Sequence, residues 1–303
     1  MDIALVSCVQ LPEPDADMAP LEAAVRAAGL SCEVVGWDDP SVDWSRFRLT
    51  LLRATWNYPQ ALPAFLDWLA RVDPVTRLWN PPALVRWNAH KGYLLELAAR
   101  GIPVAPTELV RAGSAVTLVE IIDRRGWDEV VVKPAVSAGS FRTIRVGRAG
   151  HTGDAGRAGL DAGEAHLRSL AAERDVLVQQ YLPAVEGYGE RALIWIDGAL
   201  THAVRKSPRF EGDREQVSEA MAIAPAEAAL AERVLASIDM PKLYGRVDVA
   251  PGPDGQPLVM ELELVEPSLF FRQNPEALAR LVRALGREVD LGPGLGPGVD
   301  RGR

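Results

Sequence analysis

Acidic residues within two strand-like segments near the end of the chain most constrain what this protein can be. Residues Tyr244–Phe271 read YGRVDVAPGPDGQPLVMELELVEPSLFF, with five acidic side chains, four of which lie outside the central turn, where a buried strand would carry apolar ones. The alternating segments Arg246–Ala250 and Leu258–Val265 flank a Pro- and Gly-rich connection with an Asp254-Gly255 turn signal. The pattern predicts a β-hairpin that carries a functional site.

Strand alternation distributes the side chains of the second segment over two faces. Glu261 and Glu263 share one face, and Met260, Leu262 and Leu264 are expected on the other, apolar face. Neighbouring carboxylates repel one another unless a cation lies between them. Oxygen-rich clusters suit Mg²⁺, which also bridges nucleotide phosphates.

The register of the hairpin decides whether Asp248 joins these carboxylates. A two-residue turn at Asp254-Gly255 places Asp248 opposite Glu261, whereas a loop over all of residues 251–257 shifts the register by one and turns Asp248 to the wrong face. A metal site therefore requires the tight turn or a compensating bulge. A solvated edge strand protected by acidic residues would give the same sequence pattern.

Composition limits the class of protein. The chain has 303 residues, 48% of them hydrophobic, which is enough for a large enzyme of two to three packed units, and its net charge of -8 argues against nucleic acid and membrane partners. Cys8 and Cys32 are expected to be reduced. The N-terminus lacks a basic signal region and no apolar run has the length of a membrane span, so a cytoplasmic location is expected.

Residues 1–82 have the pattern of an open α/β domain with a parallel sheet, and Asn80-Pro81-Pro82 marks its end. Ligands of such sheets bind beyond the carboxyl ends of the strands. The candidate substrate residues after the strand Leu49–Leu52 are Arg53, Thr55, Trp56 and Tyr58. A packed loop would explain these residues equally well.

Two lysines follow in the next segment. Lys91 lies in a helix predicted over Leu84–Arg100, and Lys133 closes the strand-like run WDEVVVKP. The loop after it contains Ser137, Gly139 and Ser140, whose small size lets backbone N–H groups approach phosphate oxygens. This indicates a flap over phosphates, although a plain hairpin turn would have the same sequence.

A second hairpin is predicted by the Asp197-Gly198 turn between two apolar strands. It ends in Arg205 and Lys206, one on each face, so at least one cation is expected to point into the site. The last predicted helix is Pro275–Leu285, followed by a Gly- and Pro-rich tail expected to be disordered.

The order of these parts resembles the ATP-grasp superfamily, in which two α+β lobes clamp ATP and a preceding open-sheet domain completes the substrate site. The strings RATWNYP, NPPALVRWNAHKGYLLELA, THAVRKSP and the acidic hairpin are most similar to the bacterial group that contains cycloserine synthetase and glutathione synthetase-like ligases. The resemblance implies a pre-ATP-grasp domain over 1–82, a central lobe over 83–175, a C-terminal lobe over 176–286 and a tail over 287–303.

The resemblance also implies roles for individual residues. ATP would be contacted by Lys91, Lys133, the flap residues Ser137, Gly139 and Ser140, the adenine segment Gln180, Tyr181 and Leu182, and Glu186 or Glu190 at the ribose. Two Mg²⁺ ions would be held by Asp248, Glu261 and Glu263, the last of which replaces an asparagine of the family. Arg205 and Lys206 would be catalytic, and substrate would meet Arg53, Thr55, Trp56, Tyr58, Glu266 and Ser268. Arg191 would be a further phosphate-facing cation or a surface residue.

The implied activity is ATP- and Mg²⁺-dependent ligation of a small-molecule carboxylate to an amine through an acyl phosphate, of the O-ureido-serine cyclo-ligase type. The alternatives are an intermolecular amino-acid or peptide ligase and a regulatory protein that binds ATP without catalysis. Homo-oligomerisation is left open. No side-chain nucleophile is required, and a packing or surface role is the default for His90 and His202.

Overall fold

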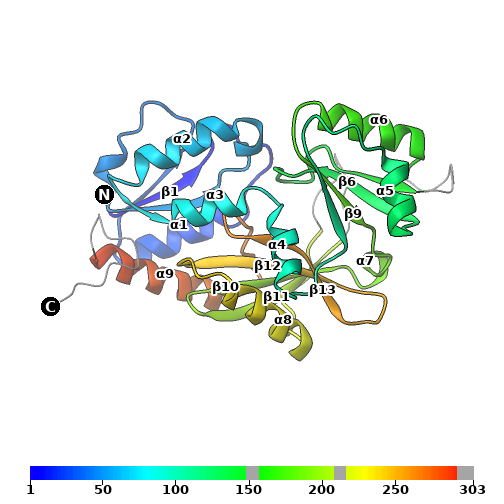
Figure 1. The fold of residues 1–303 in the computed structure, drawn as a ribbon. Coiled ribbons are helices and arrows are strands. Elements are labelled where there is room, and N and C mark those ends of the chain that lie inside the picture. Colours follow the sequence, from blue (N-terminus) through cyan, green and yellow to red (C-terminus); the bar gives the residue numbers. More distant parts are fainter. Residues whose placement is uncertain (148–156, 208–215, 292–303) are drawn as a thin grey trace.

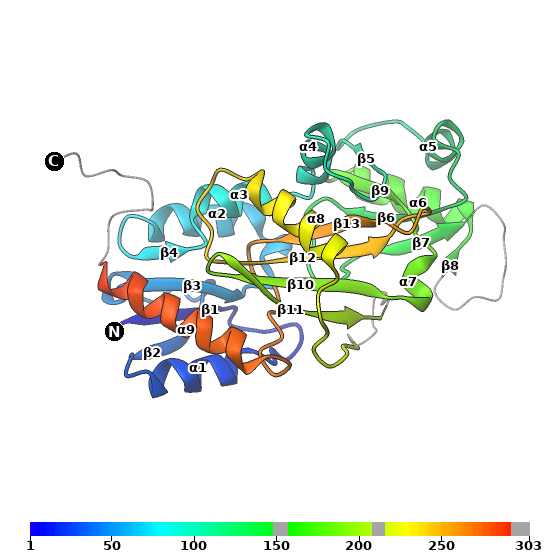
Figure 2. The same ribbon diagram turned by 90° about the horizontal axis from the view of Figure 1, so that it is seen from below.

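Three β-sheets organise the protein. The computed structural model describes residues 1–147, 157–207 and 216–291, and the predicted tail beyond 291 lies outside the described residues. Figure 1 shows the N-terminal sheet on the left and the second sheet on the upper right. Figure 2 shows the third sheet between them.

The first sheet is parallel and has the order β2-β1-β3-β4. Its strands are β1 (Ile3–Ser7), β2 (Cys32–Gly36), β3 (Leu49–Ala54) and β4 (Arg77–Trp79). Ile3 and Leu5 of β1 pack in one core with α1 (Met18–Ala27) and α9 (Pro275–Asp290), while Ala4 and Val6 pack in another with α2 (Leu62–Val72). This alternation confirms the predicted open α/β sheet covered on both faces.

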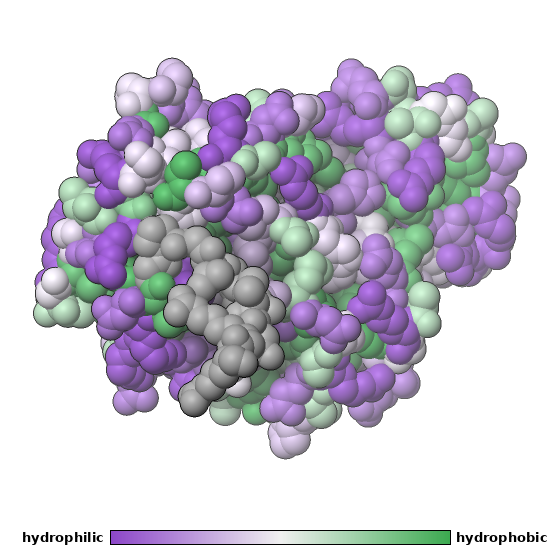
Figure 3. All heavy atoms as spheres, turned by 60° about the vertical axis from the view of Figure 1, so that its left-hand side comes forward, coloured by the Kyte–Doolittle hydropathy of each residue, from purple (hydrophilic) through white to green (hydrophobic). Residues whose placement is uncertain are grey.

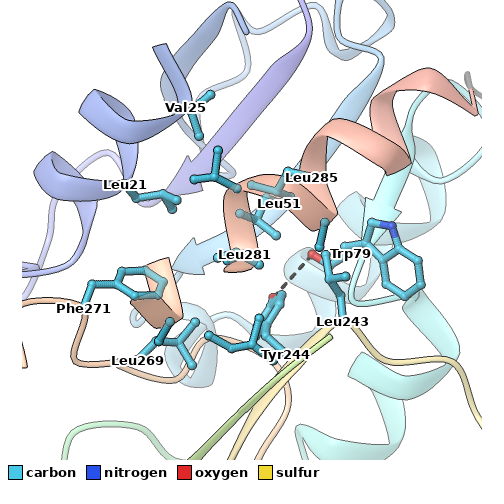
Figure 4. Close-up of a cluster of buried hydrophobic side chains, with 14 of the residues drawn as sticks. Leu21, Val25, Leu51, Trp79, Leu243, Tyr244, Leu269, Phe271, Leu281 and Leu285 are labelled. Atoms are coloured by element: carbon cyan, nitrogen blue, oxygen red, sulfur yellow. Dashed lines mark hydrogen bonds between the residues drawn. The ribbon is translucent and has the colours of Figure 1, made fainter. Parts of the chain in front are cut away.

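The last helix differs from the prediction. The helix expected to end at Leu285 continues to Asp290, because Leu281, Leu285 and Val289 extend one apolar stripe at four-residue spacing. The stripe packs in a core that contains side chains of both the first and the third sheet, and Arg280 Nε donates to the Ile196 carbonyl oxygen at 2.8 Å, so α9 joins these two sheets. Residues 287–290 are helical and are not part of a disordered tail. Figure 4 shows these leucines together with Tyr244, whose hydroxyl donates to the Trp79 carbonyl oxygen at 3.3 Å.

The second sheet has the order β5-β9-β6-β7-β8. Its strands are β5 (Thr107–Val110), β6 (Glu129–Pro134), β7 (Ile144–Gly147), β8 (Arg157–Ala158) and β9 (Val176–Gln180), and α5 (Leu118–Arg125) and α6 (Leu160–Ala171) pack against it. Because β9 pairs with β5 and β6, the domain boundary expected between residues 175 and 176 is wrong, and the chain leaves this sheet after Gln180.

The third sheet is antiparallel and has the order β11-β10-β12-β13. Its strands are β10 (Glu190–Ile196), β11 (Ala199–Lys206), β12 (Tyr244–Pro251) and β13 (Pro257–Glu263). One face packs through Leu193 and Leu262 in a core with α8 (Pro225–Ala236). Ile194 and Tyr244 on the opposite face pack in the core of the first sheet, and the rest of that face carries the charged residues described below.

The helix predicted over Leu84–Arg100 is two helices, α3 (Pro82–Asn88) and α4 (Tyr93–Ala99). Lys91 lies in the break between them, where its backbone N–H donates to the Ala135 carbonyl oxygen at 2.7 Å. This bond to the β6 end replaces the bond that a continuous helix would form. The break therefore fixes Lys91 beside the second sheet.

The remaining short elements are the 3₁₀ turns η1 (Trp44–Arg46) and η2 (Tyr58–Gln60) and the helix α7 (Ala184–Gly187). Among the helices of the described residues, none combines the length and the apolar composition that crossing a bilayer requires. Hydrophilic residues cover much of the face in Figure 3, and apolar residues occur there in small separate areas.

Candidate active site

A cavity of about 700 Å³ opens where the three sheets meet, a size typical of small-molecule sites. Its walls come from the loops after β3 and β6, the segment after β9, and the ends of β10, β11 and β13. The predicted site residues that line it are Trp56, Tyr58, Lys91, Lys133, Ser137, Gly139, Ser140, Gln180, Tyr181, Leu182, Glu190, Lys206, Glu261, Glu263, Glu266 and Ser268.

The acidic hairpin reaches the expected register through a bulge. Asp248 pairs with Glu261, and the next pair is Val249 with Val259, so Met260 is an extra residue on β13. The connection is longer than the two-residue turn, and the bulge corrects the shift that it causes. The prediction that Asp248 and Glu261 share a face is confirmed.

The same bulge makes one face assignment wrong. Met260 does not join the apolar face of Leu262 and Leu264; it lines the cavity and packs in a small core with Tyr181 and Leu182. Period-two alternation missed this position because a bulge reverses it. Met260 is thus an apolar wall next to the predicted adenine segment.

Asp248 is fully buried between two cations. Lys206 Nζ lies 2.5 Å from Asp248 Oδ2 and 2.6 Å from Glu190 Oε1, and Arg246 Nε lies 2.8 Å from Asp248 Oδ1. Burial opposes ionisation, but Arg246 and Lys206 hold the pKa of Asp248 below its usual range. Asp248 does not line the cavity; it positions the two cations that do. Burial raises the pKa of Glu190.

Lys91 joins the hairpin to the flap. Its Nζ lies 2.5 Å from Glu261 Oε1 and donates to the Ser137 carbonyl oxygen at 2.8 Å, while Lys133 Nζ donates to Gln179 Oε1 at 3.3 Å. Burial works against the charge, yet the ammonium groups of Lys91 and Lys133 lower the pKa of Glu261 to about 2. Burial lowers the pKa of Lys133, for which the structure describes no ion pair. A half-buried ammonium group of this kind at the cavity wall is suited to an anionic ligand.

The pKa values of two further glutamates are shifted in the opposite direction, upwards. Burial raises the pKa of Glu263 to about 7 and that of Glu266 to about 8, with neighbouring carboxylates adding to both shifts. Glu263 is paired with Arg246 Nη2. At this end of the cavity, burial and neighbouring carboxylates therefore favour the neutral, protonated form of both side chains.

The flap and the adenine segment are both shaped by backbone geometry. Gly139 and Ser140 in the flap line the cavity and have φ of 59° and 60°, the left-handed region that glycine adopts without strain. The N–H groups of Gln180 and Tyr181 donate to the Pro106 and Glu129 carbonyl oxygens at 2.8 and 2.9 Å. Of the three predicted adenine positions, Leu182 is the one whose N–H has no partner within the described residues.

Several predicted residues do not reach the cavity. Arg205 is exposed on the opposite face of β11 from Lys206 and packs over Gly189. Glu186 is paired with Arg145 at 2.7 Å and lies outside the cavity, which leaves Glu190 as the ribose candidate within it.

Arg53 and Thr55 are buried beneath the cavity. Arg53 Nη2 donates to the Pro267 carbonyl oxygen at 2.9 Å, so it supports the segment after β13 and does not contact the cavity. Arg191 is neither phosphate-facing nor on the surface, because it is buried and paired with Glu227 of α8 at 3.2 Å.

The two histidines near the predicted site, His90 and His202, have local partners. His90 Nε2 lies 3.3 Å from Asp175 Oδ2, and the His202 ring is buried with Nδ1 3.0 Å from Thr201 Oγ1. Neither histidine lines the cavity.

The sequence analysis did not identify Arg246, which lines the cavity. Its position two residues before Asp248, on the same strand face, was the available signal.

The donor chemistry fits a divalent cation in part. Glu261 and Glu263 present carboxylates to the cavity, and the raised pKa of Glu263 reflects charge that a cation would balance. Asp248 has both oxygens occupied by Lys206 and Arg246. Among residues 1–147, 157–207 and 216–291, no three acidic, His or Cys side chains form a ready metal-binding group, so ligand oxygens would have to complete any site at Glu261 and Glu263.

Comparison with known proteins agrees with this geometry. The family described as D-cycloserine synthetase DcsG, N-terminal domain, matches residues 3–80. The cycloserine biosynthesis protein DcsG of Streptomyces lavendulae is 36% identical over 303 residues, which cover 95% of this chain and 98% of the relative.

Solved structures show the same relationship. The crystal structure of D-cycloserine synthetase DcsG superimposes with a TM-score of 0.85 at 33% identity, over 95% of this chain and 100% of that one. A RimK domain ATP-grasp protein from Sphaerobacter thermophilus has a TM-score of 0.65 at 23% identity, over 97% and 100% of the two chains, which shows a shared fold.

A nucleotide-sized cavity between two lobes, with lysines facing a carboxylate hairpin, defines an ATP-grasp ligase, an enzyme that uses ATP to form carbon–nitrogen bonds. Within this class the chain belongs to the family of D-cycloserine synthetase DcsG.

Proposed function

We propose that the protein is an ATP- and Mg²⁺-dependent carboxylate–amine ligase that forms an amide or lactam through an acyl phosphate, with cyclisation of an O-ureido-serine as its reaction. The observation that carries the proposal is a set of four cations around one cavity, the buried Lys91, Lys206 and Arg246 and the half-buried Lys133, in a chain 36% identical to a cycloserine biosynthesis protein.

The nucleotide would occupy the end of the cavity between flap and hairpin. Lys91 and Lys133 would bind its phosphates, because the flap carbonyl of Ser137 and the Gln179 side chain already orient their ammonium groups. Leu182 N–H and the apolar Met260 suit an adenine ring, and Glu190 suits a ribose hydroxyl.

Mg²⁺ would be held by Glu261 and Glu263 together with phosphate oxygens, with two ions as the family implies; Asp248 would join them only by exchanging one of its cationic partners. When bound, Mg²⁺ draws charge off the phosphates.

The reaction would proceed in two substitutions. A substrate carboxylate oxygen attacks the γ-phosphorus, the bond to the β–γ bridging oxygen breaks, and ADP leaves. A substrate nitrogen then attacks the acyl carbon, the carbon–oxygen bond to phosphate breaks, and the nitrogen loses its proton. Lys206 and Arg246, oriented by Asp248, would stabilise the negative charge that develops on the transferred group. A carboxylate needs this activation because oxide is a poor leaving group.

An ADP-release assay over small amino acids, offered singly and in pairs with ATP and Mg²⁺, tests the proposal. Release with O-ureido-D-serine alone is expected, because one molecule supplies both carboxylate and nitrogen. Release that needs two compounds would instead identify an intermolecular ligase, and nucleotide binding without release under every condition would identify a non-catalytic protein.

A further inference from the structure

Glu266 is a buried carboxylate without a protein partner. The residue is only 8% exposed, and among the described residues no hydrogen bond or ion pair reaches its carboxylate. The Glu266 carboxylate oxygens are not among the fully buried polar atoms that lack a hydrogen-bond partner. The accessible part of the residue therefore opens into the cavity that it lines. Burying a carboxylate without a partner raises the free energy of the folded state. A bound ligand that supplies the partner would remove this penalty.

The segment that carries Glu266 is held in place along its length. Trp56 Nε1 donates to the Glu266 carbonyl oxygen at 3.1 Å, Arg53 Nη2 to that of Pro267 at 2.9 Å and Arg246 Nη1 to that of Ser268 at 3.3 Å. Asp17 accepts the next three backbone N–H groups, from Leu269, Phe270 and Phe271, at 2.6, 3.0 and 2.8 Å. The carboxylate is therefore not a mobile surface group that happens to point inward.

The surroundings of Glu266 suit a cationic nitrogen. Trp56 and Tyr58 line the same cavity as Glu266, and Trp56 Nε1 is hydrogen-bonded to the Glu266 carbonyl oxygen. The Tyr58 ring is stacked on Phe65 with centroids 4.9 Å apart, which fixes its orientation. A carboxylate beside aromatic rings is an arrangement that recognises ammonium groups.

We propose that the Glu266 carboxylate binds the ammonium group of an amino-acid substrate, with Trp56 and Tyr58 completing the subsite. This inference rests on the proposed ligase function and specifies its substrate class: a molecule with a free ammonium group in addition to the carboxylate that is activated. The ammonium group is held by charge and is not the nitrogen that attacks, since a protonated nitrogen is no nucleophile. Glu266 is thus a specificity-determining residue.

The test measures binding separately from turnover. Wild type and Glu266→Gln are saturated with a non-hydrolysable ATP analogue and Mg²⁺, and O-ureido-D-serine is titrated by calorimetry. Removing one partner of a buried charge pair is expected to weaken its binding on the order of 10²-fold. The matched ligand 3-(ureidooxy)propanoate lacks only the amino group, so its affinity should differ by less than about twofold between the two proteins.

Controls separate recognition from structure. The affinity for the ATP analogue should be unchanged, the thermal midpoint of Glu266→Gln should not fall, and Glu276→Gln on the exposed start of α9 should bind both compounds as wild type does. Equal affinity of wild type and Glu266→Gln for O-ureido-D-serine, or failure of wild type to bind it, would overturn the inference. A lower thermal midpoint would assign Glu266 a structural role and also overturn it.

The ligase proposal is decided by a different readout. ADP release by wild type supports it whatever the Glu266 variant binds. Absence of ADP release with normal binding would refute ligation and leave the ammonium subsite standing.

Discussion

The two ends of the cavity handle buried carboxylates in opposite ways. At the hairpin end, Asp248 and Glu261 are paired with Lys206, Arg246 and Lys91, and their pKa values are lowered. At the end formed after β13, burial and the neighbouring Glu263 outweigh the attraction of Lys91 and raise the pKa of Glu266 to about 8. The difference indicates that protein cations neutralise the carboxylates at the hairpin end, whereas the carboxylate of Glu266 would be neutralised by a positively charged ligand.

The largest effect is expected from replacing Asp248, which removes the buried ion pairs at the hairpin end of the cavity. Asp248→Asn leaves Lys206 and Arg246 without a full counter-charge in a buried position, which should lower the free energy of unfolding by about 3–5 kcal/mol. Urea unfolding measures this change. ADP release should be lost as well, since the two cations lose the group that orients them.

Asp254→Asn is the matched control on the same hairpin. Asp254 is exposed, and within the described part of the chain its Oδ1 accepts only the Gln256 N–H, at 3.0 Å, a bond that the asparagine carbonyl can also accept. Its unfolding curve and turnover should match wild type. Turnover of Asp248→Asn at the wild-type rate would refute the role of the Asp248 cluster.

Lys133→Ala should give the next largest effect, on the nucleotide. The ammonium group bonds only to the neutral Gln179 side chain among the described residues, so its removal costs little to the fold. Loss of one charge-assisted phosphate contact of about 1.5–3 kcal/mol weakens binding roughly 10- to 100-fold. Calorimetry with a non-hydrolysable ATP analogue measures this, and unchanged affinity would show that Lys133 does not contact the phosphates.

The raised pKa of Glu266 should make the stability of the protein depend on pH. The folded-state pKa of Glu266 is raised to about 8 from an ordinary value of 4.5, so its stabilising contribution is complete below about pH 4.5 and is lost as the pH rises towards 8. The free protein should therefore lose thermal stability between pH 5 and 8, and Glu266→Gln should lose less. Glu263 changes with the same sign in both proteins, so the difference between them reports Glu266.

Identical slopes of the thermal midpoint against pH in the two proteins would contradict the raised pKa of Glu266. Saturation with an amino-acid ligand should flatten the slope of wild type towards that of Glu266→Gln, because the bound ammonium group favours the ionised carboxylate.

Local pattern predicted much of the fold and of the site. The parallel strands of the first sheet, the second hairpin and the face shared by Asp248 and Glu261 follow from alternation and turn chemistry. The sequence left two ways to this shared face, a tight turn or a compensating bulge, and the odd length of the loop was the one signal for the bulge that the structure has at Met260. The pairing of β9 with β5 and β6 was missed. A strand can be predicted from its sequence pattern, but the pattern does not show which sheet the strand joins.

The choice between Arg205 and Lys206 shows the same limit in the site. The sequence placed one of these neighbours on each face of β11 and gave no means to decide which face is buried. The structure turns Lys206 towards Glu190 and Asp248, and leaves Arg205 in solvent. Lys206 is buried beside Asp248 of β12, which lies 42 residues further along the chain, so local pattern could not select it.

Arg205→Ala should therefore have the smallest effect. The substitution removes an exposed side chain that packs over Gly189, on the face away from the cavity, so ADP release should remain within about twofold of wild type and the change in stability within about 0.5 kcal/mol. Lys206→Ala, one residue further along the same strand, should abolish release, because Asp248 and Glu190 lose their shared ammonium group. A large loss of activity in Arg205→Ala would mean that the exposed face of β11 contributes to catalysis, and the division of charge between the two ends of the cavity would then be incomplete.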